Sequence, residues 1–575
     1  MGKFLLCSSA SDFEKISNEI SGFTQNSHLQ GIYGQIATYQ KLRIPTQNIS
    51  RCGENFATGV GTFIYKGTRD DVALQMILQD WSGNLSIRDS ILGSYCICIY
   101  KDGVMTVFVD DNATYRLYYY IDKLSGRLAV TTTSYHLAKG LGFPASELGF
   151  LENFFMRSVG SASMYPNIHQ LMGNEIIQYS DACWSVERIA TTEPVVSQDM
   201  ISYIKEKYRE LPRVFPTSGI WMTGGQDSRI SLALMLAVGM KPTCYYGRGN
   251  SSTTCTKEAD FQAVKLLSEQ QHLPMSIMNW ADSDKDNKNC YLQKYGELFL
   301  LYGMNKNIFQ EFEHTMTSEL LIFGYLGECF RTVETIMYYD KSDFSLAEYI
   351  DDMYLKREKS LMKPEVFSRF RMDIYRQYED LCLQHGIDIN HLTKDDFQKL
   401  NSFYRLRWDM FMNNFANQFM YSFPLFGEKN ILSYAENASY DEKYLSKFQM
   451  RCIEQLSPDL LKIPFFSHIK PKVYHADTHE LTEEDTSVRI KEVLQQHLTN
   501  PTMYRFCRYI YYVLRRDKKG LLEVQQEYRG REARLQQVTQ KKWSAALDIQ
   551  ALKTVNNTEL FENFSLMAYL ADSIE

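Results

Sequence analysis

The stretch "SGIWMTGGQDSRISLALMLAVG", residues 218–239, runs from an apolar segment through a pair of glycines into a helical pattern. It predicts a strand that ends at Met222, a tight turn at Gly224 and Gly225, and a helix that begins near Gln226. The first N–H groups of a helix have no partner within the helix and carry partial positive charge. Glycine lets such a backbone approach an anion closely. The stretch therefore predicts a phosphate-binding turn between a strand and a helix.

Hydroxyl and carboxylate side chains lie around the same turn. Thr223 and Ser228 could donate to phosphate oxygens, whereas Asp227 would repel a bare phosphate unless it held a divalent cation. Neither a GxxxxGK[ST] loop nor a GxGxxG fingerprint occurs here. Two glycines and an early aspartate also suit a helix start that is capped and binds nothing. The turn alone leaves both interpretations open.

Composition restricts the class of protein. The chain has 575 residues, which is too long for one core, so two or three domains are expected. The formal net charge of −7 argues against a nucleic-acid partner. No run approaches the roughly 20 apolar residues of a membrane span, and the apolar core of "MGKFLLCSS" is shorter than we expect for a signal peptide. We expect a cytoplasmic protein with no membrane partner. The 12 cysteines form no CxxC pair, which favours free thiols over zinc or disulfides.

The pattern of strands and helices divides the chain in three. Residues 1–190 are expected to form an antiparallel sheet domain, with hairpins in "SYCICIYKDGVMTVFVDD" and "RLYYYIDKLSGRLAVTTTS" and another around Gly173 and Asn174. Strands alternate with helices over residues 198–340, which predicts a parallel sheet. That part is expected to open with one helix over residues 200–215. Residues 341–575 are expected to be mainly helical, including a packed aromatic helix at "YRFCRYIYYVLRR".

The first glycine loop resembles the SGGxDS loop of the N-type ATP pyrophosphatases, the group that includes the asparagine synthetases. Gly224, Gly225, Asp227 and Ser228 match that loop, and Thr223 replaces its first serine. The resemblance implies that the loop binds the pyrophosphate end of ATP, with Mg²⁺ on Asp227. The residues that it places against the adenine are Met222, Tyr246, Phe323 and Gly324.

A second segment, "SELLIFGYLGECFRT", is similar to the GDGGDE loop of asparagine-synthetase relatives. By that likeness Glu328 shares the magnesium ion with Asp227, and Arg331 contacts a phosphate or a substrate carboxylate. Tyr325 stands where the family usually has aspartate, so one expected ligand is missing. A plain strand and turn with a capping glutamate is the other interpretation of this segment.

Two later segments extend the resemblance. "FYRLRWDMFMNNFANQF" and "FPLFGEKNILSYA" are placed like the helix and the "PFLD" segment that close the synthetase site. In the family, a lysine just beyond neutralises phosphate charge in the transition state. Lys470 and Lys472 in "HIKPK" are the candidates, with Lys462 on the near side. The sequence does not choose among them.

The N-terminal hairpins are similar to class II glutamine amidotransferase domains. A working glutaminase of that type needs a cysteine at the mature N-terminus, because the free α-amine acts as the base for its thiol. Met1 and Gly2 stand there instead, and Cys7 would serve only after six residues were removed. We therefore expect no glutaminase activity. The β-lactam synthetases and the lasso-peptide cyclases also lack this cysteine.

The resemblance, over roughly residues 80 to 475, implies an Ntn-hydrolase-like antiparallel domain followed by an α/β domain of the adenine nucleotide α-hydrolase type with a largely helical C-terminal part. The expected function is an ATP-dependent, AMP-forming carbon–nitrogen ligase that adenylates a carboxylate and couples it to a nitrogen nucleophile. The expected substrate is a small-molecule or peptide carboxylate from natural-product or surface-polysaccharide biosynthesis. A partner protein that supplies the substrate and a homodimer are both compatible with this expectation.

A catalytically inactive scaffold or regulatory protein is the alternative function. The missing N-terminal cysteine and Tyr325 favour it, whereas the intact GGxDS loop favours an enzyme. A tRNA-modifying enzyme is disfavoured by the acidic charge and by the lack of a CxxC pair.

Overall fold

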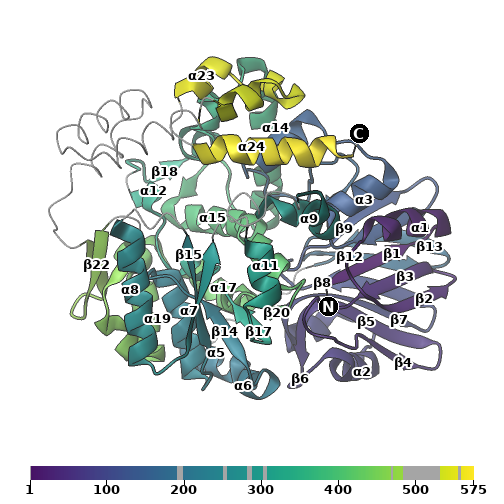
Figure 1. Cartoon of the computed structure of the whole chain (residues 1–575), viewed down its shortest axis with the longest axis horizontal. Helices are drawn as coiled ribbons and strands as arrows, with labels where there is room; N and C mark the ends of the chain where they lie inside the picture. Colours follow the sequence, from purple (N-terminus) through teal and green to yellow (C-terminus); the bar gives the residue numbers. More distant parts are fainter. Residues whose placement is uncertain are drawn as a thin grey trace. The chain divides into compact units, whose positions relative to one another are not determined.

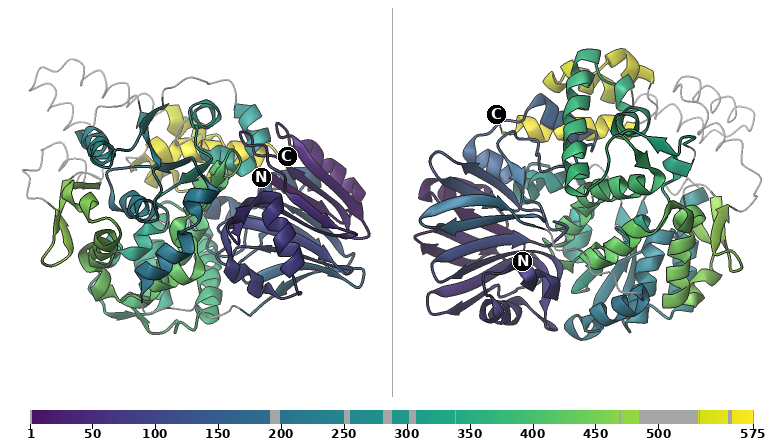
Figure 2. Two further views of the ribbon diagram at one scale, coloured as in Figure 1. Left: turned by 90° about the horizontal axis from the view of Figure 1, so that it is seen from below. Right: turned by 180° about the vertical axis from the view of Figure 1, so that it is seen from behind.

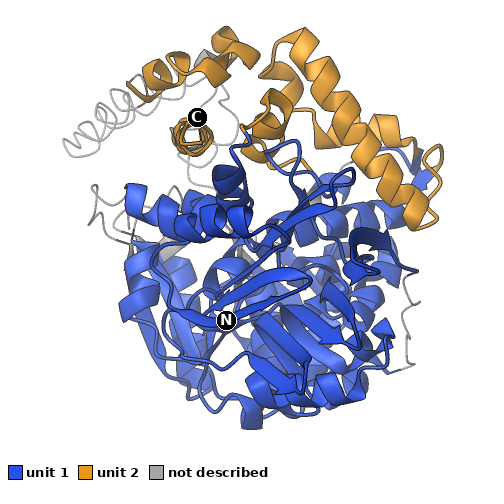
Figure 3. Ribbon diagram, turned by 90° about the vertical axis from the view of Figure 1, so that its right-hand side faces the viewer, with its two compact units in different colours: residues 1–143, 159–343, 392–483 blue, residues 144–158, 344–391, 484–575 orange. Residues whose placement is uncertain are grey.

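The computed structural model describes residues 2–190, 199–249, 255–280, 288–301, 307–337, 339–467, 470–483, 531, 533–554 and 558–574. The chain forms two compact units (Figure 3): residues 1–143, 159–343 and 392–483, and residues 144–158, 344–391 and 484–575. Both glycine loops belong to the first unit. The domain boundaries predicted at 190, 198 and 340 stay predictions. The aromatic stretch at 504–516 lies outside the described residues.

The N-terminal part of the first unit contains two antiparallel sheets that lie face to face (Figures 1 and 2). The strands of the first sheet, in spatial order, are β11 (His169–Gln170), β9 (Tyr118–Asp122), β10 (Arg127–Thr131), β1 (Lys3–Cys7), β3 (Gly34–Tyr39) and β2 (Gln25–Gly31). Those of the second are β13 (Cys183–Arg188), β12 (Glu175–Ser180), β8 (Val104–Val109), β7 (Ile91–Lys101), β5 (Asn55–Tyr65) and β4 (Ile49–Cys52), with β6 (Thr68–Arg69) paired to β5.

Alternating apolar residues from both sheets meet in one core, because successive side chains of a strand point to opposite faces. Phe4, Val60 and Val107 are examples, each at most 4% exposed. The outer faces are covered by helices: α1 (Ala10–Glu19) and α3 (Ser134–Leu141) on the first sheet, α2 (Asp70–Asp80) on the second. The result is a four-layer arrangement of helix, sheet, sheet and helix.

The first two predicted hairpins are confirmed as β7–β8 and β9–β10. The third is wrong, because β11 and β12, on either side of Gly173, belong to different sheets. A Cβ at Gly173 would lie 1.7 Å from the carbonyl oxygen of Asp111. Only glycine therefore fits at this point, where the chain passes from one sheet to the other. The actual hairpin joins β12 to β13 through Asp181 and Ala182. Both have positive φ, as a type I′ turn requires.

The first strand, β1, lies in the middle of its sheet, between β10 and β3. Cys7 at its end is fully buried, and burial raises the pKa of its thiol. Removing six residues to expose Cys7 as an N-terminus would remove most of this strand. Lys3, at the start of β1, is also fully buried, with Nζ 3.3 Å from Nδ1 of His136.

The second part of the first unit is built on a five-stranded parallel sheet, as predicted. Its strands, in spatial order, are β16 (Met275–Trp280), β15 (Thr243–Gly249), β14 (Ser218–Trp221), β17 (Leu320–Ile322) and β20 (Tyr421–Ser422). The chain adds strands on one side of β14 and then on the other, so the order reverses between β14 and β17. The sheet packs against α5 (Met200–Tyr208), α7 (Gln226–Ala237), α8 (Cys255–Gln270), α17 (Lys429–Asn437) and α19 (Lys447–Leu456).

The single helix predicted over residues 200–215 is instead two, α5 and the short α6 (Leu211–Val214). Pro212 lies in the first turn of α6, where an N–H would have no partner within the helix, so proline costs the helix no hydrogen bond.

Asparagines after helix α15 (Lys394–Trp408) connect the antiparallel and parallel parts of this unit. Oδ1 of Asn417, just beyond α16 (Met410–Ala416), accepts from Oγ1 of Thr62 at 2.8 Å and from Nζ of Lys41 at 3.3 Å. Nδ2 of Asn414 donates to the carbonyl of Thr114 at 2.9 Å. All of these groups are buried, so the two parts meet through a buried polar contact.

The second unit is helical where it is described. Its helices are α4 (Glu147–Phe154), α13 (Leu346–Glu348), α14 (Pro364–Gln384), α23 (Ile549–Thr554) and α24 (Thr558–Asp572). Phe150 stacks on Trp543 with ring centroids 4.6 Å apart and meets Phe564 edge-on at 5.4 Å. Among the residues that the structure describes, no helix has the length and apolarity to cross a membrane.

Candidate functional site

The TGGQDS loop joins β14 to α7 at the carboxyl edge of the parallel sheet. Gly225 is the N-cap of α7, and no side chain caps the helix from that position. Within the loop, Oγ of Ser228 donates to the carbonyl of Thr223 at 3.0 Å and lies 3.1 Å from its Oγ1. Ser228 is buried, whereas Thr223 is exposed. Ser228 therefore holds the turn in shape, and Thr223 is the exposed hydroxyl residue of the loop, with its Oγ1 accepting from the N–H of Gly225 at 3.3 Å.

The backbone N–H and carbonyl of Gly224, by contrast, are both hydrogen-bonded to groups of the protein interior. Its N–H donates to Oδ1 of Asp260 on α8 at 2.7 Å, and its carbonyl accepts from the N–H of Phe466 at 2.9 Å. A Cβ at Gly224 would meet Asp260, Ala263 and Phe466 at 3.0–3.2 Å. The N–H of Gly224 is thus already used, whereas that of Gly225 donates only to Oγ1 of the exposed Thr223, within the loop itself.

The second glycine loop lies directly against the first. A Cβ at Gly324 would be 2.6 Å from the backbone N of Ser228, and one at Gly327 would be 3.0 Å from the carbonyl O of Asp227. Only glycine permits this approach. Because β14 and β17 are neighbours in register, the loops that follow them converge at the point where the strand order reverses. Ligands of open α/β sheets bind at this kind of crevice.

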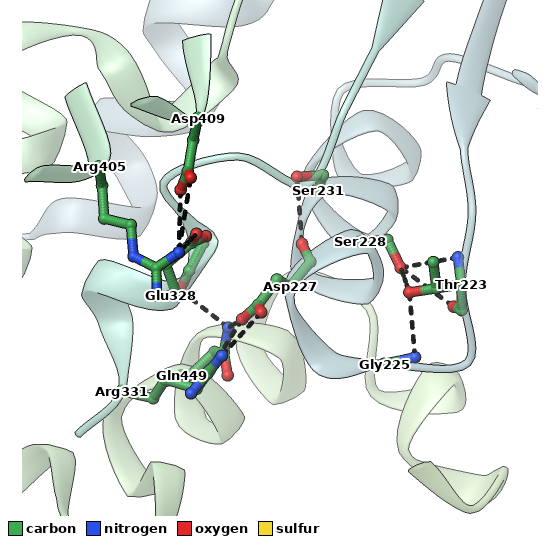
Figure 4. A network of polar contacts seen from close by, with 11 residues as sticks. Thr223, Gly225, Asp227, Ser228, Ser231, Glu328, Arg331, Arg405, Asp409 and Gln449 are labelled. Carbon is green, nitrogen blue, oxygen red and sulfur yellow. Dashed lines mark hydrogen bonds and ion pairs between the residues drawn. The ribbon is translucent and has the colours of Figure 1, made fainter. Parts of the chain in front are cut away.

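The acidic residue of the first loop is paired with the arginine of the second (Figure 4). Nε and Nη2 of Arg331 each lie 3.0 Å from a carboxylate oxygen of Asp227. Gln449 on α19 donates from Nε2 to Oδ1 of Asp227 and to the carbonyl of Gly327, both at 2.9 Å. Burial would raise the pKa of Asp227, but Arg331 and Gln449 outweigh it and hold the pKa below its usual range.

A second ion pair lies beside the first. Glu328, in the 3₁₀ turn η3 (Gly327–Phe330), has Oε1 3.3 Å from Nη1 of Arg405, which also lies 3.3 Å from Asp409 (Figure 4). Burial, together with the nearby charges of Asp409 and Asp227, raises the pKa of Glu328 well above its usual range despite Arg405.

These contacts test the predicted magnesium site. Oxygen ligands suit Mg²⁺, but both oxygens of Asp227 are engaged by Arg331, and Glu328 is engaged by Arg405. Across the described ranges, no group of three or more His, Cys, Asp or Glu residues could hold a metal ion. In this arrangement Asp227 and Glu328 do not fit a shared magnesium ion, and we derive no step through one.

The residues predicted to face adenine are mostly buried. Met222 is fully buried, and Phe323 is 4% exposed and stacks on Tyr325 with centroids 5.2 Å apart. Tyr246 bonds through its hydroxyl to Asp260 and packs on Phe261. The structure therefore brings these side chains to the carboxyl edge of the sheet, where each already has protein neighbours.

The predicted lysines lie on a small sheet formed by β21 (Phe465–Ser467), β22 (Lys470–His475) and β23 (Glu480–Glu483). Lys472 pairs in register with Phe465, and Lys470 with Ser467. The side chain of Lys470 lies outside the described residues. The adjacent Phe466 bonds to Gly224, so this sheet is anchored to the first loop. Lys462 is instead exposed and pairs with Asp459 at 2.6 Å.

Sequence reasoning missed five residues of the site: Arg229, Asp260, Arg405, Asp409 and Gln449. Arg229 follows the GGxDS pattern directly, and a charged residue at the start of an otherwise apolar helix was an available signal. Arg405 and Asp409 lie in a segment that the resemblance had marked. Nothing in the local sequence of Gln449 distinguishes it, because its role depends on where α19 packs.

Comparison with known proteins adds little to this geometry. No family model matches the chain, and no curated protein matches it. A structure of glutamine phosphoribosylpyrophosphate amidotransferase from B. subtilis, complexed with ADP and GMP, aligns over 59% of this chain and 78% of its own, at 11% identity and a TM-score of 0.23. A structure described as the allosteric regulatory enzyme of purine biosynthesis aligns over 43% and 51%, at 11% identity and a TM-score of 0.19. Neither score supports an argument, so the site rests on its own geometry.

Proposed function

We propose that the chain is an ATP-dependent carbon–nitrogen ligase that adenylates a substrate carboxylate and transfers the acyl group to a nitrogen nucleophile. The observation that carries the proposal is the meeting of two glycine loops where the order of the parallel strands reverses, with Gly324 packed against Ser228. A helix start without a side-chain cap at this position suits the pyrophosphate part of a nucleotide.

In the proposed reaction, a carboxylate oxygen attacks the α-phosphorus of ATP, and the bond to the bridging oxygen breaks to release pyrophosphate. The nitrogen nucleophile then adds to the acyl carbon, loses a proton and displaces AMP. The N–H of Gly225 and the first turn of α7 bind the pyrophosphate, with Thr223 as a hydroxyl donor. Arg331, which donates to the carboxylate of Asp227 in the structure, would donate to a phosphate oxygen in the same way. Lys472 or Lys470 neutralises charge from the neighbouring sheet.

The proposed substrate is a small-molecule or peptide carboxylate of cytoplasmic natural-product or surface-polysaccharide biosynthesis. The nitrogen comes from the substrate or from another protein, because Cys7 is buried inside a sheet and does not act as a glutaminase nucleophile. A partner protein that delivers the substrate and a homodimer are part of this proposal.

ATP–pyrophosphate exchange tests the proposal. The purified chain, supplied with a panel of amino-acid, peptide and sugar-acid carboxylates, should exchange labelled pyrophosphate into ATP with at least one of them. Asp227→Ala should abolish the exchange, because it removes the carboxylate that positions Arg331. The absence of exchange with every carboxylate, in a protein that also fails to bind ATP, would refute the ligase.

A non-catalytic scaffold or regulatory protein is the second candidate function. The observation that favours it is that Asp227 and Glu328 are each paired with an arginine and that the N–H of Gly224 is bonded to Asp260. A folded chain that binds no ATP would support this candidate over the ligase.

A further inference from the structure

Arg229, in the first turns of α7, is fully buried, and none of the roles above uses it. Its Cζ lies 3.7 Å from the centre of the Phe465 ring. The two Nη atoms donate to four main-chain carbonyls: Nη1 to Leu460, at 3.1 Å, and to Ile463, and Nη2 to Pro464, at 2.9 Å, and to Gly224, at 3.3 Å. All four Nη hydrogens are thus matched by acceptors from two separate segments.

Burying a guanidinium costs free energy unless its donors are satisfied; both Nη groups of Arg229 are, whereas its buried Nε has no acceptor among the described residues. Burial lowers the pKa of Arg229 to about 9, and the charge of Asp260 opposes that shift. Lysine has three donors and no planar fork, so it cannot replace all four bonds. The position therefore needs arginine for the geometry of its donors as well as for its charge.

One of those bonds sets the orientation of a peptide group in the first glycine loop. The carbonyl of Gly224 points inward, to Arg229 and to the N–H of Phe466. In a trans peptide, the following N–H points the opposite way. The N–H of Gly225 is therefore turned away from the interior, and it donates to Oγ1 of the exposed Thr223 at 3.3 Å.

The other three bonds hold the segment that leads into the lysine-bearing sheet. Leu460 belongs to the 3₁₀ turn η8 (Pro458–Lys462), and Ile463 and Pro464 follow it directly. Phe465, under the guanidinium, is the register partner of Lys472. One side chain thus fixes both the glycine loop and the first strand of the sheet that carries the candidate lysines.

We infer that Arg229 is a positioning residue for the anion site: it holds the Gly224–Gly225 peptide with its N–H turned toward the ligand and keeps β21 and β22 beside the loop. This inference rests on the proposed function, because it concerns the same pyrophosphate-binding loop. Arg229 itself does not contact the ligand.

Titration with inorganic pyrophosphate tests the inference in the full-length chain. The wild type should bind it, and Arg229→Lys should weaken binding at least tenfold. Selective ¹⁵N-glycine labelling adds a readout that a general loss of stability would not move. The Gly225 resonance, identified by its absence in Gly225→Ala, should shift on adding pyrophosphate in the wild type. In Arg229→Lys it should start at a different position and respond weakly.

Arg209→Lys is the matched control, because Arg209 is an exposed arginine that pairs with Glu206. It should bind pyrophosphate as the wild type does. If Arg229→Lys does not fold, Phe465→Leu keeps every carbonyl acceptor and removes only the ring under the guanidinium, and it should weaken binding in the same direction.

Two outcomes overturn the inference. Equal pyrophosphate affinity and an unchanged Gly225 resonance in a folded Arg229→Lys or Phe465→Leu variant would refute it alone. No pyrophosphate binding by the wild type would refute it together with the anion site. Weakened pyrophosphate binding in the variants, in a wild type that neither exchanges nucleotide with any carboxylate nor binds ATP, would leave the inference standing and refute the ligase.

Discussion

Arg331 and Asp227 form a two-point ion pair, with both N–O distances at 3.0 Å, that joins the second glycine loop to the first. Each side chain is partly accessible, at 21% and 29%. The residue predicted to carry a metal ion therefore has a guanidinium as its counter-charge. The pair keeps the two loops in contact and places a cation beside the start of α7.

The strength of this pair is measurable by a double-mutant cycle on Asp227→Asn and Arg331→Gln. Bonds between charged groups in a partly buried site should give a coupling of about 1–3 kcal/mol in the free energy of unfolding. The exposed pair of Lys462 and Asp459 is the matched control, with an expected coupling of about 0–0.5 kcal/mol. Urea denaturation gives both values, and a coupling near zero for Arg331 and Asp227 would contradict the structure.

Divalent-cation binding should respond to the same arginine. Since Arg331 occupies both oxygens of Asp227, the wild type without nucleotide should bind Mn²⁺ weakly, and Arg331→Gln should bind it more tightly by about tenfold. The double variant with Asp227→Asn should lose that gain. Electron paramagnetic resonance of free Mn²⁺ measures all three proteins. Tight binding by the wild type that Arg331→Gln leaves unchanged would show that the cation binds elsewhere.

The close approach of the loops predicts opposite results for two glycine substitutions. Gly324→Ala places a Cβ 2.6 Å from a backbone nitrogen, so it should destabilise the protein by about 3 kcal/mol. Gly225 has φ of −74°, and its Cβ would meet only Oγ1 of Thr223, at 3.2 Å, and the carbonyl of Phe466, at 3.7 Å. Gly225→Ala should therefore leave the melting temperature nearly unchanged. Similar melting temperatures for both variants would contradict the packing described.

The buried Lys3 predicts a pH-dependent stability difference. Burial lowers the pKa of Lys3 to about 7, although the charge of Glu297 opposes the shift and Lys294 adds to it. Between that pH and the ordinary value of 10.5, the unfolded chain binds the extra proton. The stability of the wild type relative to Lys3→Met, which cannot titrate, should therefore rise with pH across this window, by at most about 1.4 kcal/mol per pH unit.

Urea unfolding of both proteins at pH 6.5 and 9.5 measures that difference. Burial, with the charge of Lys3, holds the pKa of the neighbouring His136 well below its usual range. A difference that does not change with pH would mean that Lys3 is charged in the folded protein.

The parallel sheet was predictable because local signals agree with the tertiary structure. The apolar run before Thr223, the glycine pair and the helical period after Gln226 each predict the element that forms there, and β14 and α7 confirm them. The prediction of a hairpin at Gly173 is wrong for a physical reason. A glycine needed for close packing between layers looks, in sequence, like a glycine needed for a turn.

The chemistry of the site was less predictable than its position. The likeness of loops predicted that Asp227, Glu328 and Arg331 share one site, and the structure brings them together; the metal that it assigned to the two acids stays a prediction. Their partners in the structure include Gln449 and Arg405, which come from helices far along the chain. A motif fixes the local backbone, whereas ion pairs depend on which distant side chains pack beside it.

The most direct test of the account is the binding of ATP, in the presence of Mg²⁺, to the wild type and to Gly225→Ala by isothermal titration calorimetry. The wild type should bind ATP at one site per chain. The variant should bind it at least tenfold more weakly, with an unchanged far-ultraviolet circular dichroism spectrum, because a Cβ at Gly225 stands where the phosphates approach α7. No binding by the wild type, or equal affinity in both proteins, would contradict the assignment of the nucleotide site to the two glycine loops.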